Sequence, residues 1–310
     1  MGRYDENLSM DSNLPFISVI VPALNEEQNI RECLVSLLKM DYPPERLEVL
    51  VVDNGSTDRT AEIVKSFPVC YLHEEKRGCP TARNAAIRAS RGDIIASTDS
   101  DCIASQLWLR ELVKAFDEDG VGGVAGEVVA YPPRTPTEWY AAKVRHLSPQ
   151  KYLCRPLLPF AAFANIAFRR EVFNQIGLLD ETIPNGESTD FCTRFFRETG
   201  LKLEYAPKAV VFHRHRATTR EFFQQQRNYG RGHAQLYIKY RHEIPWGWRQ
   251  TVLAYRDLAR ATWGLAKSGL RYGFQRDKED FYFSYFEFLK KLAEREGFIR
   301  QSLSQGYLYF

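Results

Sequence analysis

The sequence has no Cys-x-x-Cys pair, although it contains six cysteines, at positions 33, 70, 79, 102, 154 and 192. None of them has the close cysteine and the paired histidines that a structural zinc site requires. A disordered chain, a collagen and a disulfide miniprotein are also excluded, because 44% of the 310 residues are hydrophobic and 26% are charged. We therefore expect a globular, cytosolic protein with reduced thiols.

Long apolar runs are also missing. The longest mostly apolar stretches, at 17–24 and 157–168, are shorter than the roughly 20 residues that span a bilayer. The first residues, MGRYDENLSMDSNLPF, contain no apolar signal core. We expect an N-terminal tail over 1–14, no membrane-crossing segment and a cytoplasmic location, with peripheral contact on the inner face of the membrane left open.

The sequence contains neither GxGxxG nor GxxxxGK[ST], so a standard dinucleotide site and a P-loop are not expected. Short apolar, β-branched runs instead alternate with helical patterns over residues 17–130. This alternation is typical of successive βα units, and it predicts an α/β, Rossmann-like fold with a mainly parallel central sheet flanked by helices. The predicted strands are ISVIVPA (17–23), LEVLVVDN (47–54), VCYLHE (69–74) and DIIASTDS (93–100).

Polar residues follow three of these strands. Asn25 and Glu26 follow the first, Asp53 ends the second, and the triplet Asp99-Ser100-Asp101 ends the fourth. Ligands of such sheets bind at the carboxyl ends of the strands, so these side chains are expected to line one crevice. Carboxylate oxygens suit Mg²⁺ or Mn²⁺, which can hold a diphosphate. The alternative for an isolated Asp-x-Asp is a solvated acidic turn.

Four segments occur in the order and at the spacings of one family. They are VIVPALNEEQNI, VVDNGSTDRTAEIV, GCPTARNAAIRASRGDIIASTDSD and GESTDFCTRFFRETG. On these segments the chain, over about residues 15–240, resembles the family 2 glycosyltransferases, which are inverting enzymes of the GT-A fold. The resemblance implies a nucleoside diphosphate sugar donor, usually UDP-linked, and a divalent metal, Mn²⁺ or Mg²⁺. The sugar would pass to a hydroxyl of a glycan, a lipid-linked or a small-molecule acceptor, as in cell-envelope or polysaccharide biosynthesis.

The resemblance also assigns residues on the donor side. Asp53 matches the acidic residue that hydrogen-bonds the nucleotide base, and Arg83 resembles the basic residue beside the nucleotide. Asp99 and Asp101 match the DxD pair, with Asp101 as the preferred direct metal ligand. The alternatives are turn and helix capping for Asp53 and a surface salt bridge for Arg83. The residues that resemble the wall of the donor site are Pro22, Ala23, Asn25 and Glu26.

The catalytic base is expected in the run Gly186-Glu187-Ser188-Thr189-Asp190. The family often has GEDxD here, so a serine occupies the position that often carries the base. We expect a helix capped by Ser188 or Thr189 and ended by Gly200. Asp190 ranks slightly ahead of Glu187 on motif alignment, while Glu187, in the loop before the cap, would avoid most of the helix dipole. The alternative for Asp190 is a role in stabilising the helix start.

Four further residues are candidates by resemblance. His213, at the end of the segment LKLEYAPKAVVFH (201–213) that is predicted as a strand pair, is a candidate third metal ligand, and Asn165 lies where family members approach the acceptor. Arg227 and Arg231 belong to a segment that resembles the QxxRW element, with Asn228 in place of tryptophan. The alternative for His213 is a histidine without a metal-binding role, and the alternative for Asn165 is a buried amide hydrogen-bonded to the backbone. Arg227 and Arg231 could instead lie on a helix surface that packs on the sheet.

The last hundred residues differ in charge from the rest. Residues 211–310 contain 18 Lys and Arg against 9 Asp and Glu, and they hold 22 of the 41 aromatic residues. On a helix, Arg249, Arg256, Arg260 and Lys267 would form one basic ridge beside Trp263. This face could rest on anionic lipid, or its aromatics could pack on the catalytic domain or on a second subunit in a homodimer. Nucleic-acid binding is not expected.

These observations predict a GT-A catalytic domain over 15–215, with a nucleotide-sugar half at 15–130 and an acceptor and base half at 131–215. A basic, aromatic, helical extension would follow at 216–310. Two other functions remain open at this point: a sugar nucleotidyltransferase, although its Gly-rich, Lys-containing loop is missing, and a noncatalytic sugar-nucleotide or glycan-binding module, which the altered GEDxD motif favours.

Overall fold

The computed structural model describes residues 14–145, 147–153, 155, 157–244 and 246–309. The predicted N-terminal tail, apart from Leu14, and Cys154 lie outside the described residues. The chain divides into two compact units. The first unit comprises Met1–Val129, His146–Glu181 and Ser188–Arg214, and the second comprises Ala130–Arg145, Thr182–Glu187 and His215–Phe310.

The first unit is built on an eight-stranded mixed sheet with the order β3-β2-β1-β4-β7-β6-β8-β5. Strands β3, β2, β1 and β4 are parallel, whereas β7 runs antiparallel to both β4 and β6, and β5 runs antiparallel to β8. The α/β class is confirmed. The strands are β1 (Ile17–Ala23), β2 (Leu47–Asp53), β3 (Cys70–His73), β4 (Ile94–Thr98), β5 (Cys102–Ala104), β6 (Val121–Ala130), β7 (Asn165–Arg169) and β8 (Lys202–His213).

Apolar clusters lie on both faces of this sheet. On one face, Val19 and Val21 of β1 share a cluster with residues of α2 and α5. On the other, Ile20 shares a cluster with residues of α4, α7 and α8. Every residue of β1 is buried, as expected for a parallel strand covered on both sides. The helices are α2 (Ile30–Leu38), α3 (Thr60–Lys65), α4 (Cys79–Ala89), α5 (Trp108–Ala115), α7 (Arg170–Ile176) and α8 (Glu187–Glu198).

Two predictions of local structure are wrong. The segment 201–213 is a single strand, β8, and not a strand pair. Pro207 does not break it, because the φ angle of proline is compatible with extended backbone wherever no ladder N–H is needed. Helix α8 begins at Glu187, so neither Ser188 nor Thr189 precedes the helix as its cap. Glu187 therefore lies in the first helical turn and does not escape the helix dipole.

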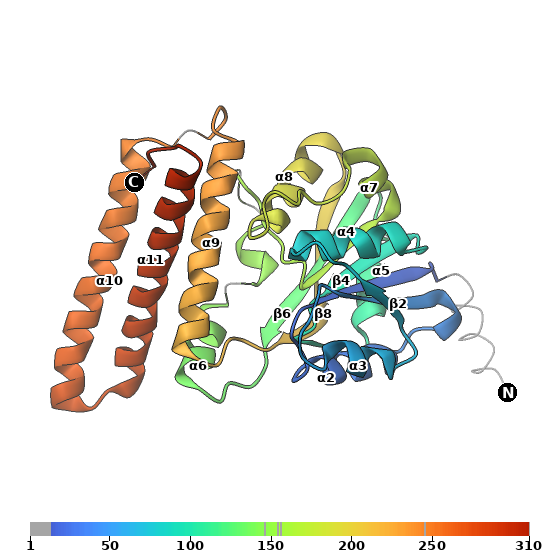
Figure 1. The fold of residues 1–310 in the computed structure, drawn as a ribbon, viewed down its shortest axis with the longest axis horizontal. Helices are drawn as coiled ribbons and strands as arrows, with labels where there is room; N and C mark the ends of the chain where they lie inside the picture. The colour runs from blue at the N-terminus through green and yellow to red at the C-terminus, as the bar shows by residue number, and fades with distance from the viewer. Residues whose placement is uncertain (1–13, 146, 154, 156, 245, 310) are drawn as a thin grey trace. The chain divides into compact units, whose positions relative to one another are not determined.

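The second unit is helical, and Figure 1 shows its long helices α9, α10 and α11 running side by side. Thr218 and Glu221 form a capping box at the start of α9. None of the helices in the described part of the chain is long and apolar enough to cross a membrane. The helices are α6 (Pro136–Val144), α9 (Thr219–Lys239), α10 (Trp248–Gln275) and α11 (Lys278–Ser304).

Two glycines let α9 and α11 approach closely. A Cβ added at Gly297 would overlap the carbonyl oxygen of Arg227, and a Cβ at Gly230 would overlap that of Glu294. We expect Gly297→Ala to lower the free energy of unfolding by about 2 to 3 kcal/mol, because two backbones must move apart. Chemical denaturation measures this change. Gly264→Ala on α10, where a Cβ meets nothing within 4 Å, is the matched control and should be neutral or slightly stabilising.

Candidate functional site

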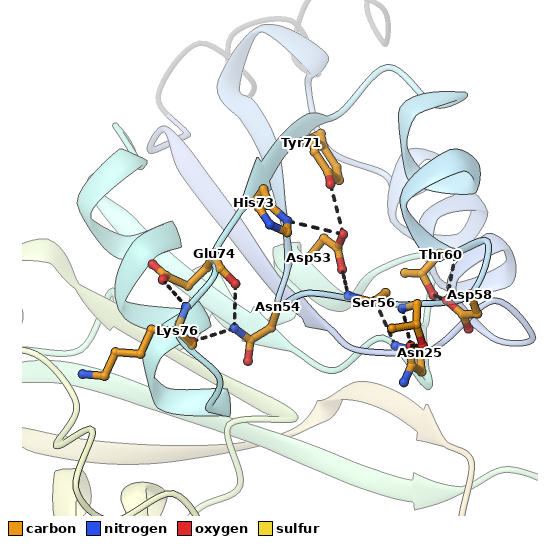
Figure 2. A network of polar contacts seen from close by, with 11 residues as sticks. Asn25, Asp53, Asn54, Ser56, Asp58, Thr60, Tyr71, His73, Glu74 and Lys76 are labelled. Atoms are coloured by element: carbon orange, nitrogen blue, oxygen red, sulfur yellow. Dashed lines mark hydrogen bonds and ion pairs between the residues drawn. The ribbon is translucent and has the colours of Figure 1, made fainter.

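The loops that leave β1 and β2 are joined by hydrogen bonds. Asn25 adopts a positive φ of 55°, and its backbone N–H donates to Ser56 Oγ at 2.9 Å, while its side-chain oxygen accepts from the Thr57 N–H at 2.8 Å. The Glu26 N–H donates to Thr60 Oγ1 at 2.8 Å. Since Ala23 and Asp53 are register partners, both loops lie at the same edge of the sheet. Figure 2 shows Asn25 beside Ser56 in this network.

Asp53 is a buried carboxylate held by this network. Oδ1 accepts from the Ser56 N–H at 2.9 Å, and Oδ2 accepts from the Tyr71 hydroxyl at 3.0 Å, with His73 Nδ1 at 3.7 Å (Figure 2). Burial raises the pKa of Asp53, but the hydrogen bonds from Ser56 and Tyr71 and the nearby His73 outweigh it, so the pKa lies below its ordinary value. Asp53 thus has the turn-forming role. A second role toward a nucleotide base stays a prediction.

This pKa shift has a sign that can be tested. The pKa of Asp53 is lower in the folded state than in the unfolded state. The ionised carboxylate therefore stabilises the folded state fully above the unfolded pKa of about 4, and this stabilisation is lost as the pH falls through the folded pKa. We expect Asp53→Asn to lower the free energy of unfolding by about 1 to 3 kcal/mol at pH 7. The difference in free energy of unfolding between wild type and variant should become smaller below about pH 4. Urea unfolding at a series of pH values measures this. Glu62→Gln, an exposed acid on α3, is the control.

The Asp99 end of the DxD triplet is bound to a buried arginine. Arg83, on α4, donates from Nη2 to Asp99 Oδ1 at 2.6 Å. The Arg83 side chain is 4% exposed and its guanidinium lies 5.2 Å from the ring of Phe163, whereas the Asp99 side chain is 29% exposed. Arg83 is therefore a buried arginine in a part-buried ion pair, which does not fit the alternative of a surface salt bridge. Its role beside a nucleotide stays a prediction.

The Asp101 end of the triplet meets the end of β8. His213 Nε2 lies 3.4 Å from Asp101 Oδ1, and both residues are buried. Cys102 is the register partner of His213 and places its Sγ 3.9 Å from the same oxygen. One ligand atom from each of these three residues lies within 4.8 Å of the other two. The structure thus brings two of the three residues predicted as metal ligands, Asp101 and His213, into one cluster. The third, Asp99, is not a member of this cluster and is paired with Arg83 instead.

One member of this cluster, Cys102, and one neighbour, Arg214, are absent from the sequence-based assignments. Cys102 directly follows the DxD triplet, a position that could have drawn attention to it. Its pKa is raised well above the ordinary value by burial and by the carboxylates of Asp101 and Asp99, so the thiol is neutral. Arg214 donates its backbone N–H to the Asp101 carbonyl at 3.0 Å and its guanidinium to Asn29 Oδ1 at 3.2 Å. No sequence signal pointed to Arg214.

The two candidate bases lie in the first turn of α8 and differ in their surroundings. The Asp190 side chain is 0% exposed, and its Oδ2 lies 3.0 Å from Nε of Arg194, one turn later. Arg194 also donates to the carbonyl of Leu178 at 2.8 Å. Asp190 is therefore part of a buried ion pair that ties α8 to the loop after α7. Glu187, at the helix start, is 9% exposed.

Asn165 lies in the core. It is 0% exposed, accepts from Trp108 Nε1 at 2.7 Å and donates to the carbonyls of Glu127 and Ala209 at 2.9 and 2.8 Å. All of its amide atoms are engaged, which is the buried-amide alternative of the sequence analysis. Contact with an acceptor would require these bonds to break.

The remaining candidates, Arg227 and Arg231, lie on α9 in the second unit. Arg227 donates to Gln224 Oε1 at 2.6 Å and lies 3.6 Å from Glu296. The contacts of Arg227 thus lie within its own helix and with α11. Contact of Arg227 and Arg231 with the diphosphate or the acceptor stays a prediction.

Comparison with known proteins agrees with this arrangement. Residues 18–177, more than half of the chain, match the family described as Glycosyl transferase family 2. Glycosyltransferase AglE of Haloferax volcanii is 32% identical over 237 residues, which cover 74% of this chain and 76% of that protein. The chain belongs to glycosyltransferase family 2 and is a glycosyltransferase. A sugar nucleotidyltransferase and a noncatalytic module are therefore not retained.

Other similar proteins carry more specific names. A pre-mycofactocin glycosyltransferase of Mycobacterium tuberculosis is 29% identical, with 72% of this chain and 48% of that protein covered. Among solved structures, the mannosyltransferase PcManGT of Pyrobaculum calidifontis, in complex with GDP-Man and Mn²⁺, has a TM-score of 0.62 at 21% identity, covering 92% of this chain and 88% of that one. TarS 1-349 of S. aureus with UDP-GlcNAc has a TM-score of 0.54 at 18% identity, covering 95% and 93%. These structures identify the fold as GT-A.

Proposed function

We propose that the protein is an inverting glycosyltransferase that moves a sugar from a nucleoside diphosphate sugar to an acceptor hydroxyl with the help of a divalent cation. The observation that carries the proposal is the gathering of charged groups at one edge of the sheet. The ends of β1, β2 and β4 contribute the Asp53 network and the DxD triplet, and β8 adds His213 beside Asp101.

The residues beside Asp101 fit a divalent cation. The carboxylate of Asp101, in the turn between β4 and β5, lies beside the imidazole of His213 at the end of β8, and a neutral thiol lies next to both. The imidazole favours Mn²⁺ over Mg²⁺, because Mg²⁺ prefers a shell made only of oxygen ligands. PcManGT, which has the same fold, was solved with Mn²⁺ and GDP-Man. Asp101 and His213 would hold the cation, which neutralises the diphosphate when bound.

The other residues of this edge have separate tasks in the proposal. Arg83 supplies a second positive charge near the diphosphate while its ion pair with Asp99 positions both groups. Asp53 accepts an N–H of the nucleotide base, because each of its oxygens can accept more than one hydrogen bond. The base is uracil in this proposal. Guanine offers a similar N–H, so GDP-Man belongs among the donors tested.

The reaction is a displacement at the anomeric carbon. The acceptor oxygen forms a bond to this carbon as the bond to the diphosphate oxygen breaks, and the electron pair leaves with the diphosphate. A carboxylate takes the acceptor proton. We propose Glu187 for this role, ahead of Asp190, because Glu187 lies at the very start of α8 and is 9% exposed, whereas Asp190 is 0% exposed and forms an ion pair with Arg194. The acceptor is a hydroxyl of a glycan, a lipid-linked sugar or a small molecule.

The test is the release of nucleoside diphosphate from UDP-Glc, UDP-GlcNAc and GDP-Man, each with Mn²⁺, Mg²⁺ or a chelator, and with glycan and lipid-linked acceptors. Release from one donor that requires both acceptor and cation would support the proposal. NMR of the product would then show a β-linkage from an α-linked donor. Retention of the α configuration would overturn the inverting mechanism, and full activity with the chelator would overturn the role of the cation.

A further inference from the structure

Helix α10 exposes an apolar stripe along its length. Trp248 is 71% exposed, Trp263 is 73% exposed and Leu270 is 68% exposed, while Val252, between the two tryptophans, is 54% exposed. At about 100° per residue, these four side chains fall within about 60° of arc, so they lie in one row. Two of the five tryptophans of the protein are thus displayed to solvent on one helix face.

A cationic stripe runs beside this apolar stripe. It consists of Arg249, Arg256, Arg260, Lys267 and Arg271, which at about 100° per residue also fall within about 60° of arc. All five residues are exposed. The only acidic residue of α10 is Asp257, which lies 3.5 Å from Arg256 and 3.7 Å from Arg260. The helix therefore carries a net charge of +4, from five cations and one anion.

The opposite side of α10 packs inside its own unit. Ser268 is 2% exposed, and Tyr272 stacks on Phe281 of α11 with 5.2 Å between ring centroids. Arg271 of the cationic stripe lies 3.6 Å from an acidic residue of α11, Asp280. The apolar and cationic stripes are thus not the packing face of the helix bundle, and within the described residues they face solvent.

We propose that α10 is a membrane-surface helix that docks this protein on anionic lipid. Trp248 and Trp263 enter the boundary between headgroups and acyl chains, and the cationic stripe meets lipid phosphates. The helix lies in the plane of the interface and does not cross the bilayer, consistent with its five cations. The inference does not depend on the donor. Taken with the proposed function, it would bring the enzyme to a surface that carries lipid-linked acceptors.

Charge favours a lipid surface over a second copy of the chain as the occupant. Two copies joined through their apolar stripes would bring two rows of five cations together, with one Asp257 from each copy to oppose them. An anionic bilayer offers the complementary charge beside an apolar layer, which are the two features of this face. Isolated exposed hydrophobic residues need no explanation, but four of them in a row beside a cationic row do.

The experiment is flotation of the full chain with vesicles of phosphatidylcholine alone, or of phosphatidylcholine and phosphatidylglycerol in equal parts. We expect binding to the anionic vesicles, with a blue shift of tryptophan emission, and at least about tenfold weaker binding to neutral vesicles or in about 0.5 M NaCl. The variant Arg249→Gln/Arg256→Gln/Arg260→Gln should bind the anionic vesicles about a hundredfold more weakly than wild type, because each cation removed lowers the affinity by about fivefold. Trp248→Ser/Trp263→Ser should lose about tenfold or more, together with the blue shift.

Matched control variants test whether the effect is specific to this face of α10, and not a general effect of removing exposed cations or exposed apolar side chains. Lys39→Gln/Lys202→Gln/Lys208→Gln removes three exposed cations from the first unit, and Leu107→Ser/Leu157→Ser removes two exposed leucines. Both should bind like wild type, and thermal unfolding checks that every variant is folded. Equal binding by wild type and the arginine variant would overturn the proposal. So would a dimer in sedimentation experiments without lipid that dissociates in the tryptophan variant, because a second copy would then cover the face.

Discussion

Asp101→Asn is expected to reduce cation-dependent release of nucleoside diphosphate by about a thousandfold, because one charged ligand of the proposed cation is lost while the side chain keeps its shape. The effect should be large because Asp101 is buried against His213, 3.4 Å away, so water cannot easily replace the missing oxygen. Release would be measured across a Mn²⁺ titration with the active donor. The affinity of the Asp101→Asn variant for Mn²⁺ in the absence of donor, measured by calorimetry, should also be lower than that of wild type.

Two further variants make this prediction specific. His213→Gln should raise the Mn²⁺ concentration required by about tenfold to a hundredfold, because it removes the second ligand and retains a polar side chain. Asp93→Asn is the matched control, since Asp93 directly precedes β4 at the end opposite to the DxD triplet. It should behave like wild type. An Asp101→Asn enzyme with unchanged Mn²⁺ dependence would show that the cation, if needed, is held by other residues.

The sequence alone predicted that the polar residues after β1, β2 and β4 lie at one edge of the sheet, because the signals there are local. The run ISVIVPA is apolar throughout, and the structure has β1 over the same residues, Ile17–Ala23. Polar residues begin where β1 and β4 end, and Asp53 ends β2, so topology places them at one edge. Such reasoning needs only the period of the hydrophobic pattern and the direction of parallel strands.

Contacts that join distant segments could not be read in the same way. The approach of His213 to Asp101 depends on the pairing of β5 with β8, which links Cys102 to His213, and β5 is only three residues long. Family resemblance suggested His213, but no local pattern predicted the pairing itself. The ion pair between the buried Arg83 and Asp99 could not be predicted either, because a sequence does not tell how far an arginine is buried.

The start of α8 illustrates a different limit. Ser188 and Thr189 are good cap residues, so the sequence favoured a helix that began after them. The observed helix begins at Glu187, where an acidic side chain is stabilised by the amino-terminal end of the helix dipole. One or two residues of difference at a helix start is a common error. Here it matters, because it moves Glu187 from the loop into the helix and places both candidate bases in the first turn.

Glu187→Gln and Asp190→Asn are expected to fail in different ways. Glu187→Gln should lower the turnover number by about a hundredfold to ten-thousandfold, because an amide cannot accept the acceptor proton. Donor binding should stay near wild type, and the free energy of unfolding should fall by about 1 kcal/mol because the charge at the helix start is lost. Asp190→Asn should lower the free energy of unfolding by about 3 kcal/mol, because Arg194 loses the anion that balances its charge in a buried pair. Its loss of activity should follow the loss of folded protein.

The two effects separate when turnover, donor binding and thermal unfolding are measured on the same preparations. Glu198→Gln, an exposed glutamate at the other end of α8, controls for the chemical change itself. If Asp190→Asn remained fully folded and lost turnover while Glu187→Gln kept it, the base would be Asp190 and the ion pair with Arg194 would have to open during the reaction. Because Arg194 also donates to the carbonyl of Leu178, such opening would leave the arginine held in place while Asp190 turned toward the acceptor.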